Sequence, residues 1–400
     1  MARQSIHIVG ASLAGIRAAE ALRRREFDGR IVLIGDEPHH PYDRPPLSKQ
    51  VLAGEWEVDR LALTKPEKFE DLDLDLRLGV RATSFDLASR TLSTDTGDDI
   101  VDGLVIATGA RCRTLPGTEE MSGVHVLRSL DDALALRADL DAGPDRVVVV
   151  GAGFIGAEVA ATCRGRGHAV TMVEPLPTPL GRVLGDDIGG VMAEVHVEHG
   201  VDLRTGVGVD RLEADAGRVA RVVLTDGTVL ESDLVVIGIG VLPNTEWLEG
   251  SGLTLDNGVV CDATMLAAPG VTAAGDVARW PNQRFDELMR VEHWDNAIEQ
   301  GVHAAERLLV DDDDAVPFEP VPWFWSDQYD RKIQLAGRIR PGDDTHLATG
   351  SLEERRFAQL FGRDGRLVGV LGFNRPRHVM QYKTMIQDGV AFADAVAADI

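Results

Sequence analysis

The chain has 400 residues, of which 44% are hydrophobic, and a formal net charge of −24 at pH 7, so we expect two or three globular domains and no general affinity for nucleic acid. No apolar run approaches the ~20 residues of a membrane span, and the N-terminus enters a predicted strand at once, leaving no room for a signal peptide. Cys112, Cys163 and Cys261 are widely separated, which excludes a disulfide framework, offers no metal-ligand spacing and favours a cytoplasmic location.

In chain order, the first predicted unit is a strand over 6–9, a glycine turn and a helix over 16–25, followed by a strand over 31–36. The turn, GASLAG at 10–15, is similar to a dinucleotide-binding loop, but Ser12 stands where the middle glycine is expected. Such a turn points backbone N–H groups and the positive end of a helix dipole at one spot, where a pyrophosphate fits. Taken alone, the match is equally typical of a tight strand-to-helix turn.

A second copy of this pattern starts 141 residues further along. A strand over 146–150 leads through GAGFIG at 151–156 and a helix over 157–167 into a strand over 169–174. All three glycines are present in this copy: the first makes the tight turn, the second lets phosphate approach, and the third lets helix and strand pack closely. The alternation of strands and helices predicts βαβ units around parallel sheets.

In both copies the strand after the helix ends in an acidic residue. In the first copy it is Asp36, with Glu37 as the alternative, and in the second copy it is Glu174. A carboxylate there accepts hydrogen bonds from a ribose hydroxyl, although each acid alone is equally typical of a strand end. The two complete units together predict two dinucleotide sites and therefore two cofactors that exchange electrons. Because no arginine directly follows Glu174, we expect NADH to be preferred over NADPH.

Three later strands add smaller signals. The segments 104–110 and 234–244 are apolar and end in small residues, while 271–278 ends in Gly-Asp, where Asp276 is placed to bind ribityl hydroxyls. These pieces favour flavin plus nicotinamide. The acidic run 311–314 is interpreted as a solvated linker before a third, C-terminal unit.

Longer motifs carry a family resemblance over nearly the whole chain. They are PYDRPPLSK (41–49), ATGA (107–110), GAGFIG with Glu158, AAGDVA (273–278), VEHWDNAIEQG (291–301) and WFWSDQYD (323–330). The sequence resembles the FAD-dependent, NADH-using ferredoxin reductases of multicomponent oxygenase systems, of the putidaredoxin reductase and rubredoxin reductase type. In that family the first glycine turn holds FAD, with GASLAG as a variant, and the second turn holds NADH.

The resemblance implies roles for individual residues. Those implied for FAD lie in the first turn, its acid, the PPLSK motif and three later segments: Gly10, Ser12, Gly15, Asp36, Arg44, Lys49, Arg128, Asp276 and Trp294. Those implied for NADH are Gly153, Ile155, Glu158 and Glu174. The remaining implied cofactor-binding residues are Leu13, Ala14, Ala82, Ala107, Thr108, Gly109, Gly151, Phe154, Gly156, Arg182, Gly240, Glu292, His293 and Trp325, with Trp323 as the alternative to Trp325 for covering the flavin. Lys49 and Glu158 are the predicted catalytic residues, and no metal is expected.

The implied architecture is an α/β fold with two Rossmann-like dinucleotide-binding domains and a C-terminal α/β interface domain. The FAD domain is expected over 1–111 and 246–320, the NAD domain over 112–245 and the interface domain over 321–400. NADH would pass a hydride to FAD, and single electrons would leave to a small [2Fe–2S] ferredoxin, with rubredoxin as the alternative acceptor. The expected protein is a cytoplasmic monomer or weak dimer with no membrane partner.

Other flavoprotein functions use the same fold. A disulfide reductase or a water-forming NADH oxidase needs redox cysteines beside the flavin, and PPLSK contains none. A redox sensor of the apoptosis-inducing-factor type shares RPPLSK but would be expected to carry a targeting segment. An NADH oxidase and such a sensor are the alternatives to a ferredoxin reductase.

Two basic stretches stand out in this acidic chain. Residues 331–340 hold four cations and residues 373–383 hold three, with no acid in either stretch: Arg331, Lys332, Arg338, Arg340, Arg375, Arg377 and Lys383. As a group they predict a docking face for an acidic iron–sulfur protein. Each cation alone is equally expected to pair with a nearby carboxylate.

Overall fold

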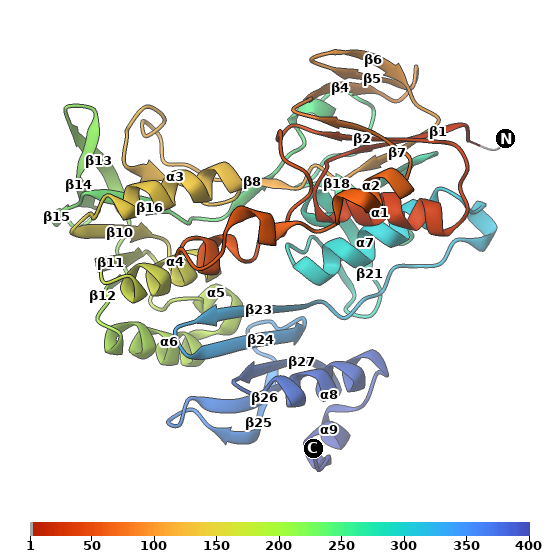
Figure 1. Ribbon diagram of the computed structural model, residues 1–400. Coiled ribbons are helices and arrows are strands. Elements are labelled where there is room, and N and C mark those ends of the chain that lie inside the picture. The colour runs from red at the N-terminus through yellow and green to blue at the C-terminus, as the bar shows by residue number, and fades with distance from the viewer. Residues whose placement is uncertain (1–2) are drawn as a thin grey trace. The chain divides into compact units, whose positions relative to one another are not determined.

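A computed structural model describes residues 3–400 of the chain (Figure 1). The chain divides into two compact units. Unit 1 comprises Met1–Asp43, Leu61–Arg111 and Leu242–Trp323, and unit 2 comprises Arg44–Arg60, Cys112–Val241 and Phe324–Ile400. Within the part of the chain that is described, no helix combines the length and the apolar character needed to cross a membrane.

Unit 1 is built on a six-stranded sheet with the strand order β19-β20-β7-β1-β2-β3. Five strands run parallel and the edge strand β19 is antiparallel. The strands are β1 (Ser5–Val9), β2 (Arg30–Gly35), β3 (Leu74–Leu78), β7 (Gly103–Ile106), β19 (Leu266–Ala268) and β20 (Val271–Ala273). The strands predicted over 6–9 and 31–36 are therefore present, and the apolar segments near 104 and 271 extend the same sheet.

Two helices, α1 (Leu13–Arg24) and α7 (Trp294–Arg307), lie side by side on one face of this sheet (Figure 1). Gly301 of α7 permits their close approach, because a Cβ at this position would lie 2.4 Å from the carbonyl oxygen of Ala14. Isoleucine and leucine side chains from the strands and alanines from both helices form the core between them. α1 begins three residues before the predicted helix, because Ser12 is its N-cap and Gly15 lies inside its first turn.

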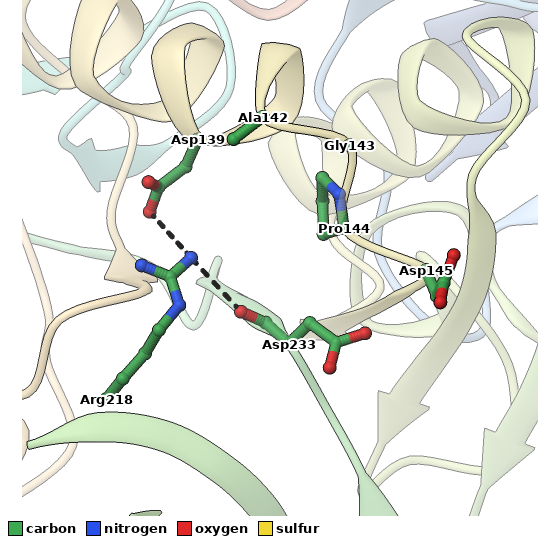
Figure 2. Close-up of a pocket in the computed structure, with 7 residues that line it drawn as sticks. All are labelled: Asp139, Ala142, Gly143, Pro144, Asp145, Arg218 and Asp233. Carbon is green, nitrogen blue, oxygen red and sulfur yellow. Dashed lines mark hydrogen bonds and ion pairs between the residues drawn. The ribbon is translucent and has the colours of Figure 1, made fainter. Parts of the chain in front are cut away.

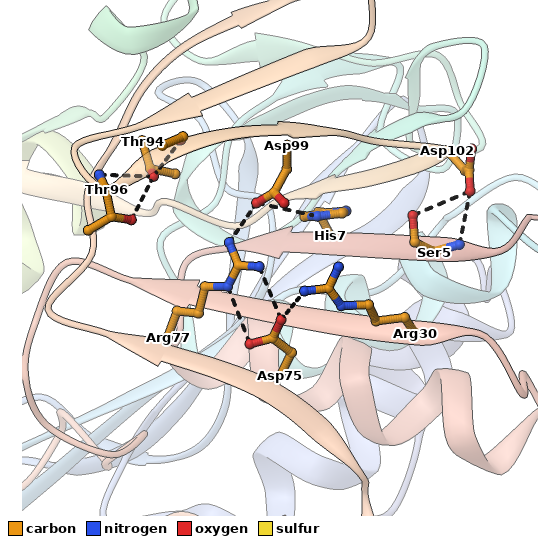
Figure 3. A network of polar contacts seen from close by, with 10 residues as sticks. Ser5, His7, Arg30, Asp75, Arg77, Thr94, Thr96, Asp99 and Asp102 are labelled. Atoms are coloured by element: carbon orange, nitrogen blue, oxygen red, sulfur yellow. Dashed lines mark hydrogen bonds and ion pairs between the residues drawn. The ribbon is translucent and has the colours of Figure 1, made fainter.

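A three-stranded sheet of β4 (Ala82–Asp86), β5 (Thr91–Thr94) and β6 (Gly97–Ile100) also belongs to unit 1. A polar layer joins it to the main sheet (Figure 3). Arg77 of β3 donates to Asp99 of β6 at 2.6 Å, while His7 of β1 is 1% exposed and lies 3.8 Å from the same carboxylate. Burial, assisted by Arg30 and Arg77 against the opposing effect of Asp99, lowers the pKa of His7 to about 4.

Protonation of His7 should make the fold pH-sensitive. Because the folded pKa is about 4 and that of an unfolded histidine is about 6.5, His7 contributes stability that is complete above pH 6.5 and is lost as the pH falls towards 4. The full contribution is about 3 kcal/mol. We expect the melting temperature of the holoprotein to fall between pH 7.5 and 5, and to fall less in His7→Leu. An equal fall in both proteins would exclude His7 as the titrating group.

The amino-terminal part of unit 2 is a parallel sheet with the order β12-β11-β10-β16-β9. Its strands are β9 (Val124–His125), β10 (Arg146–Val150), β11 (Ala169–Glu174), β12 (Asp202–Thr205) and β16 (Leu234–Ile237). The helices of this segment are α3 (Leu130–Asp141), α4 (Phe154–Gly165), α5 (Gly181–Leu184) and α6 (Asp186–Glu198). The second predicted βαβ unit is thus present, and α4 again begins three residues before the predicted helix because Gly156 lies in its first turn.

Residues 323–400 form a second sheet, with the order β23-β24-β27-β26-β25 and helices α8 (Pro376–Gln387) and α9 (Phe392–Ala397). Its strands are β23 (Trp323–Gln328), β24 (Arg331–Gly337), β25 (Asp344–Ser351), β26 (Arg356–Arg363) and β27 (Arg366–Phe373). The other helices and strands that the structure describes are α2 (Pro66–Asp71), β8 (Ala110–Cys112), β13 (Val209–Asp215), β14 (Arg218–Leu224), β15 (Val229–Glu231), β17 (Val241–Pro243), β18 (Val259–Val260), β21 (Ala278–Asn282) and β22 (Glu287–Met289).

The acidic run before this sheet is solvated, as predicted, since all four aspartates at 311–314 are exposed. Asp312–Asp314 form a short 3-10 turn, and Asp312 makes an ion pair with Arg307 of α7. The Arg307 side chain is only 6% exposed, so the run is anchored to unit 1 through a buried guanidinium.

Candidate dinucleotide-binding and redox site

Three turns meet at the carboxyl ends of adjacent parallel strands in unit 1. GASLAG follows β1, ATGA follows β7 and the Gly-Asp turn follows β20. Backbone hydrogen bonds connect these segments, since Ala107 N–H donates to the Val9 carbonyl at 2.7 Å and Ala274 N–H to the Ile106 carbonyl at 2.9 Å. Ligands of open α/β sheets bind at this edge.

The first turn requires glycine at two of its three positions. Gly10 has a φ of +120°, and a Cβ there would lie 2.0 Å from the Ala107 oxygen. A Cβ on Gly15 would lie 1.9 Å from the Gly10 oxygen. Both contacts are with the chain's own backbone, so these two glycines are needed for the turn to fold.

The second turn, in unit 2, shows what the middle position requires. Gly151 (φ +97°) and Gly156 again leave no room for a side chain, because an added Cβ would lie 2.4 Å from the Gly238 oxygen and 2.0 Å from the Gly151 oxygen, respectively. A Cβ on Gly153, in contrast, would meet nothing within 4 Å. The protein itself therefore tolerates a side chain at the middle position. This explains how Ser12 is accommodated in the first turn, and it leaves the space beside Gly153 open to a pyrophosphate.

Glu174, at the end of β11, is fixed beside the second turn. Its carboxylate accepts the N–H of Ala152 at 2.8 Å and the N–H of Leu176 at 3.0 Å. The residues that come after Glu174 in the sequence line a hollow of about 240 Å³: Leu176, Pro177, Gly181, Arg182 and Asp186. The predicted Glu174 and Arg182 are thus brought to the same end of the sheet as the second glycine turn.

Two other predicted residues of this edge are accessible. Ile155, in the first turn of α4, is 47% exposed, and Gly240, with a φ of +96°, lies in the exposed turn after β16. The structure therefore assembles the second turn, Ile155, Glu174, Arg182 and the turn after β16 along one edge of the unit 2 sheet.

The Gly-Asp turn of unit 1 is held by two residues that sequence reasoning missed. The N–H of Gly275 donates to the buried Gln300 side chain at 2.8 Å, and Arg290 donates to the carbonyl oxygen of Asp276 at 2.9 Å. Gln300 lies inside the VEHWDNAIEQG motif, and only the packing of α7 shows that its side chain faces the turn. Asp276 itself is half-buried.

The ATGA turn and the start of α7 are also fixed by side chains. The Thr108 hydroxyl donates to the Asn244 carbonyl at 2.9 Å, and the Asn244 amide donates to the Thr108 carbonyl at 2.8 Å. At the start of α7, the Trp294 indole donates to Asp43 at 2.7 Å, which connects the VEHWDNAIEQG motif to the PYDRPPLSK motif. His293 is the N-cap of this helix.

The environments of the two candidate ribose acids differ. The Asp36 side chain is 60% exposed and lies 3.5 Å from Arg81, whereas Glu37 accepts a hydrogen bond from the Tyr42 hydroxyl. Ala82, the first residue of β4, is half-buried directly after Arg81. Asp36 therefore has the more accessible carboxylate.

Lys49 and Glu158, the predicted catalytic residues, form an ion pair within unit 2. Lys49 lies in a π-helical turn, Leu47–Val51, and its ammonium is 2.8 Å from the Glu158 carboxylate. π-Helical turns are rare and are frequent at functional sites. Glu158 also accepts from the Ser48 and Ser326 hydroxyls, neither of which was predicted. Arg44 donates to the Arg128 carbonyl at 2.6 Å, so the structure also joins these two predicted residues.

Trp323 and Trp325 are both half-buried on β23. Glu292 makes an ion pair with Arg290 at 2.7 Å, the same arginine that holds the carbonyl of Asp276. Glu292 is therefore placed near the Gly-Asp turn by way of Arg290.

A larger hollow of about 380 Å³ lies elsewhere in unit 2 (Figure 2). It is lined by Asp139, Ala142, Gly143, Pro144, Asp145, Arg218 and Asp233. Asp145 and Asp233 directly precede β10 and β16, so the hollow is at the amino ends of the strands, opposite the edge that binds ligands. Arg218 already pairs with Asp139 at 3.3 Å, and we assign this hollow no function.

The cations of the two basic stretches lie at different distances along the C-terminal sheet. Lys332, in β24, lies beside Asn374, whereas Arg338, the residue directly after β24, lies beside Val368, six residues and about 20 Å further along the chain. Arg375 and Arg377 at the start of α8 therefore belong with Lys332 and not with Arg338. Burial, then Arg375 and Arg377, lower the pKa of His378, which follows Arg377 on α8.

Comparison with known proteins agrees with this geometry. Residues 4–301 match the pyridine nucleotide-disulphide oxidoreductase family, and residues 323–400 match the reductase C-terminal domain. The chain belongs to the pyridine nucleotide-disulphide oxidoreductase family. It is 38% identical to rhodocoxin reductase of Rhodococcus erythropolis, with 99% of this chain and 92% of that protein covered. It is 36% identical to putidaredoxin reductase of Pseudomonas putida, with 97% and 92% covered.

A solved structure shows the same relationship. The reductase chain in the covalent putidaredoxin reductase–putidaredoxin complex matches with a TM-score of 0.93 at 34% identity, covering 100% of this chain and 97% of that one. These matches confirm the predicted resemblance, the α/β fold, the class of flavoprotein oxidoreductase, and FAD and NAD(H) as the cofactors of this family member.

Proposed function

We propose that this family member is an NADH-dependent ferredoxin reductase that supplies single electrons to a small [2Fe–2S] ferredoxin serving an oxygenase. The observation that supports it most directly is the pair of glycine turns. In each turn, backbone atoms leave no room for a side chain at the first and third positions. The middle position has open space in the second turn and is occupied by a small serine in the first. The PPLSK motif contains no redox cysteine, which favours a one-electron protein acceptor over a disulfide.

We assign the cofactors by turn. FAD is held by the first turn with Asp36, the ATGA turn and Asp276, and NADH is held by the second turn with Ile155, Glu174 and Arg182. The corresponding domains are 1–111 with 246–320 for FAD, 112–245 for NAD and 321–400 for the acceptor. Bound FAD supplies the chemistry that takes a hydride from NADH and releases electrons singly.

The chain's own residues bind and orient these groups. Backbone N–H groups at the start of α1 and α4, with the positive ends of those helices, favour the pyrophosphates. The family resemblance gives Lys49 a place at the flavin, where a cation stabilises the negative charge of the reduced ring. Glu158 fixes the Lys49 ammonium at 2.8 Å, and Trp325 is assigned to cover the ring.

The partner and the setting are also proposals. A ferredoxin is named in relatives such as the anthranilate 1,2-dioxygenase reductase component of Burkholderia cepacia, which is 38% identical over 96% of this chain. We propose an acidic ferredoxin, a cytoplasmic location consistent with three free cysteines, and a monomer or weak dimer in solution.

The direct test is an absorption spectrum of the purified protein, followed by titration with NADH without air and then addition of a ferredoxin. We expect flavin bands that bleach with about one equivalent of NADH and recover as the ferredoxin is reduced. Absence of flavin would exclude the proposal. Rapid turnover of NADH with oxygen alone would favour an NADH oxidase.

Lys49→Ala should retain FAD but slow the reduction of the flavin by NADH by about tenfold or more, because the charge of the reduced ring loses its nearby cation. Stopped-flow spectroscopy without air measures the rate. Asp276→Ala is the contrasting variant and should weaken FAD retention during gel filtration instead. Reduction of Lys49→Ala at the native rate would place Lys49 outside the reaction.

A further inference from the structure

We propose that Ser326, oriented by Gln328, is a positioning residue for Glu158 and, through it, for Lys49. The inference rests on the proposed function, in which Lys49 serves flavin reduction. It assigns the C-terminal domain a part in the first electron transfer, from NADH, in addition to binding the acceptor. All five residues of this network, Ser48, Lys49, Glu158, Ser326 and Gln328, lie in unit 2.

The Glu158 carboxylate is only 4% exposed and each of its oxygens is engaged. Oε2 faces the Lys49 ammonium at 2.8 Å and the Ser48 hydroxyl, and Oε1 accepts the Ser326 hydroxyl at 2.7 Å. Ser326 is therefore the donor to the carboxylate oxygen that faces away from Lys49. Without it, one oxygen of a buried carboxylate loses its donor.

The direction of each hydrogen bond follows from the chemistry of the groups. An ionised carboxylate can only accept, so the single proton of Ser326 must point at Glu158. The lone pairs of the same hydroxyl then accept from the amide nitrogen of Gln328, 3.0 Å away. Since Ser326 and Gln328 are both 0% exposed, water does not compete for either bond. Gln328 thus fixes the rotation of the Ser326 hydroxyl.

Helix α4 and strand β23 contact each other at two pairs of residues, which fixes their alignment. Phe154 and Glu158 are four residues apart on α4 and share one face of that helix. Phe324 and Ser326 are two residues apart on β23 and share one face of that strand. Phe154 packs edge-to-face on Phe324, with ring centroids 4.6 Å apart, and Glu158 binds Ser326. The helix that begins at the NADH turn is in this way aligned with the first strand of the C-terminal domain.

Loss of the Ser326 hydroxyl should let the Glu158 carboxylate rotate and loosen its contact with Lys49. The turnover step that needs Lys49 should then slow, while binding of NADH, which uses the glycine turn and Glu174, should be unaffected. If Ser326 served packing alone, its loss would lower the melting temperature and would not slow flavin reduction selectively while NADH binding stays native.

The test compares Ser326→Ala, Ser326→Thr, Gln328→Met and the control Ser232→Ala. Ser232 is a buried serine of unit 2, 1% exposed, whose hydroxyl donates to the Leu234 carbonyl at 2.9 Å. Flavin reduction by NADH is followed by stopped flow. We expect the limiting rate of Ser326→Ala to fall about tenfold with the half-saturating NADH concentration nearly constant. The limiting rate of Gln328→Met should fall less, and that of Ser326→Thr, which keeps the hydroxyl, should approach the native value.

A second readout needs no activity. An amine held in hydrogen bonds reacts slowly with an acetylating reagent, so trace labelling of each lysine, read by mass spectrometry, should show Lys49 reacting several-fold faster in Ser326→Ala. Lys68 on unit 1, 51% exposed, is the internal reference and should not change. Ser232→Ala should leave both readouts at native values.

Native rate and native labelling of Lys49 in Ser326→Ala would overturn the inference, as would equal losses in Ser326→Ala and Ser232→Ala. Failure of the native protein to be reduced by NADH would instead overturn the proposed function. In that case the labelling of Lys49 still decides whether Ser326 holds the ion pair.

Discussion

Glu174→Ala is expected to remove most of the discrimination between NADH and NADPH. On the proposed assignment, the 2′-phosphate of NADPH would meet the Glu174 carboxylate of the native protein and forfeit about two hydrogen bonds to the ribose, a cost of about 3 kcal/mol or roughly 100-fold in affinity. The variant should lower this preference below about tenfold, measured as the ratio of kcat/KM for the two nucleotides.

The structure also predicts a gain of affinity for NADPH in Glu174→Ala. Removing the carboxylate leaves the N–H groups of Ala152 and Leu176 without the acceptor they have now, and Leu176 lines the same hollow as Arg182. These donors and the guanidinium favour an anion, so the variant should gain affinity for NADPH as well as lose affinity for NADH. Glu213→Ala, a partly exposed glutamate in β13, is the control and should keep the native ratio. Comparable use of both nucleotides by the native protein would contradict the role of Glu174.

Reversing Lys332, Arg375 and Arg377 to glutamate should slow ferredoxin reduction about 10- to 100-fold at low salt, because an acidic partner loses its steering. These three cations lie at one end of β24 and α8, where Arg375 and Arg377, after burial, also lower the pKa of His378. The native rate should fall as salt rises, since steering is screened over ~10 Å at 0.1 M. Reduction of the flavin by NADH, and turnover with ferricyanide, should stay at native values.

The matched control reverses Arg204, Arg211 and Arg221, which are each more than 40% exposed on unit 2 and change the net charge equally. It should leave ferredoxin turnover nearly native. Equal slowing by the two triple variants would mean that net charge alone matters. No slowing by the first would mean that the ferredoxin docks elsewhere.

Local patterns made much of the fold predictable. The strands at 6–9, 31–36, 146–150 and 169–174 follow from apolar runs, and the turns follow from glycines whose φ values other residues rarely adopt. The helices that follow the two glycine turns, α1 and α4, begin three residues earlier than predicted. Glycine is a poor helix former, and its presence in the first helical turn is explained only by the structure, where a Cβ at that position would lie about 2 Å from the first glycine's carbonyl oxygen.

The parts that could not be predicted depend on distant residues. Ser326 binds Glu158 across 168 positions of sequence, and Gln300 holds Gly275 across 25. The motifs containing Ser326 and Gln300 were recognised, but a motif does not state which of its side chains faces a turn. The same limit affected the basic stretches, because the antiparallel register of β24 and β27 separates cations that composition alone groups together.

The two glycine turns also show how a duplicated unit can diverge. After duplication, the first and third positions had no freedom to drift, because any Cβ at Gly10, Gly15, Gly151 or Gly156 would collide with backbone atoms, either of the same turn or of the turn after the neighbouring strand. Only the middle position was open to change without loss of the fold, and it is here that the copies differ, as Ser12 and Gly153. The middle position is therefore the one glycine position of the turn at which a change of residue can alter the contact with a bound pyrophosphate without disturbing the fold.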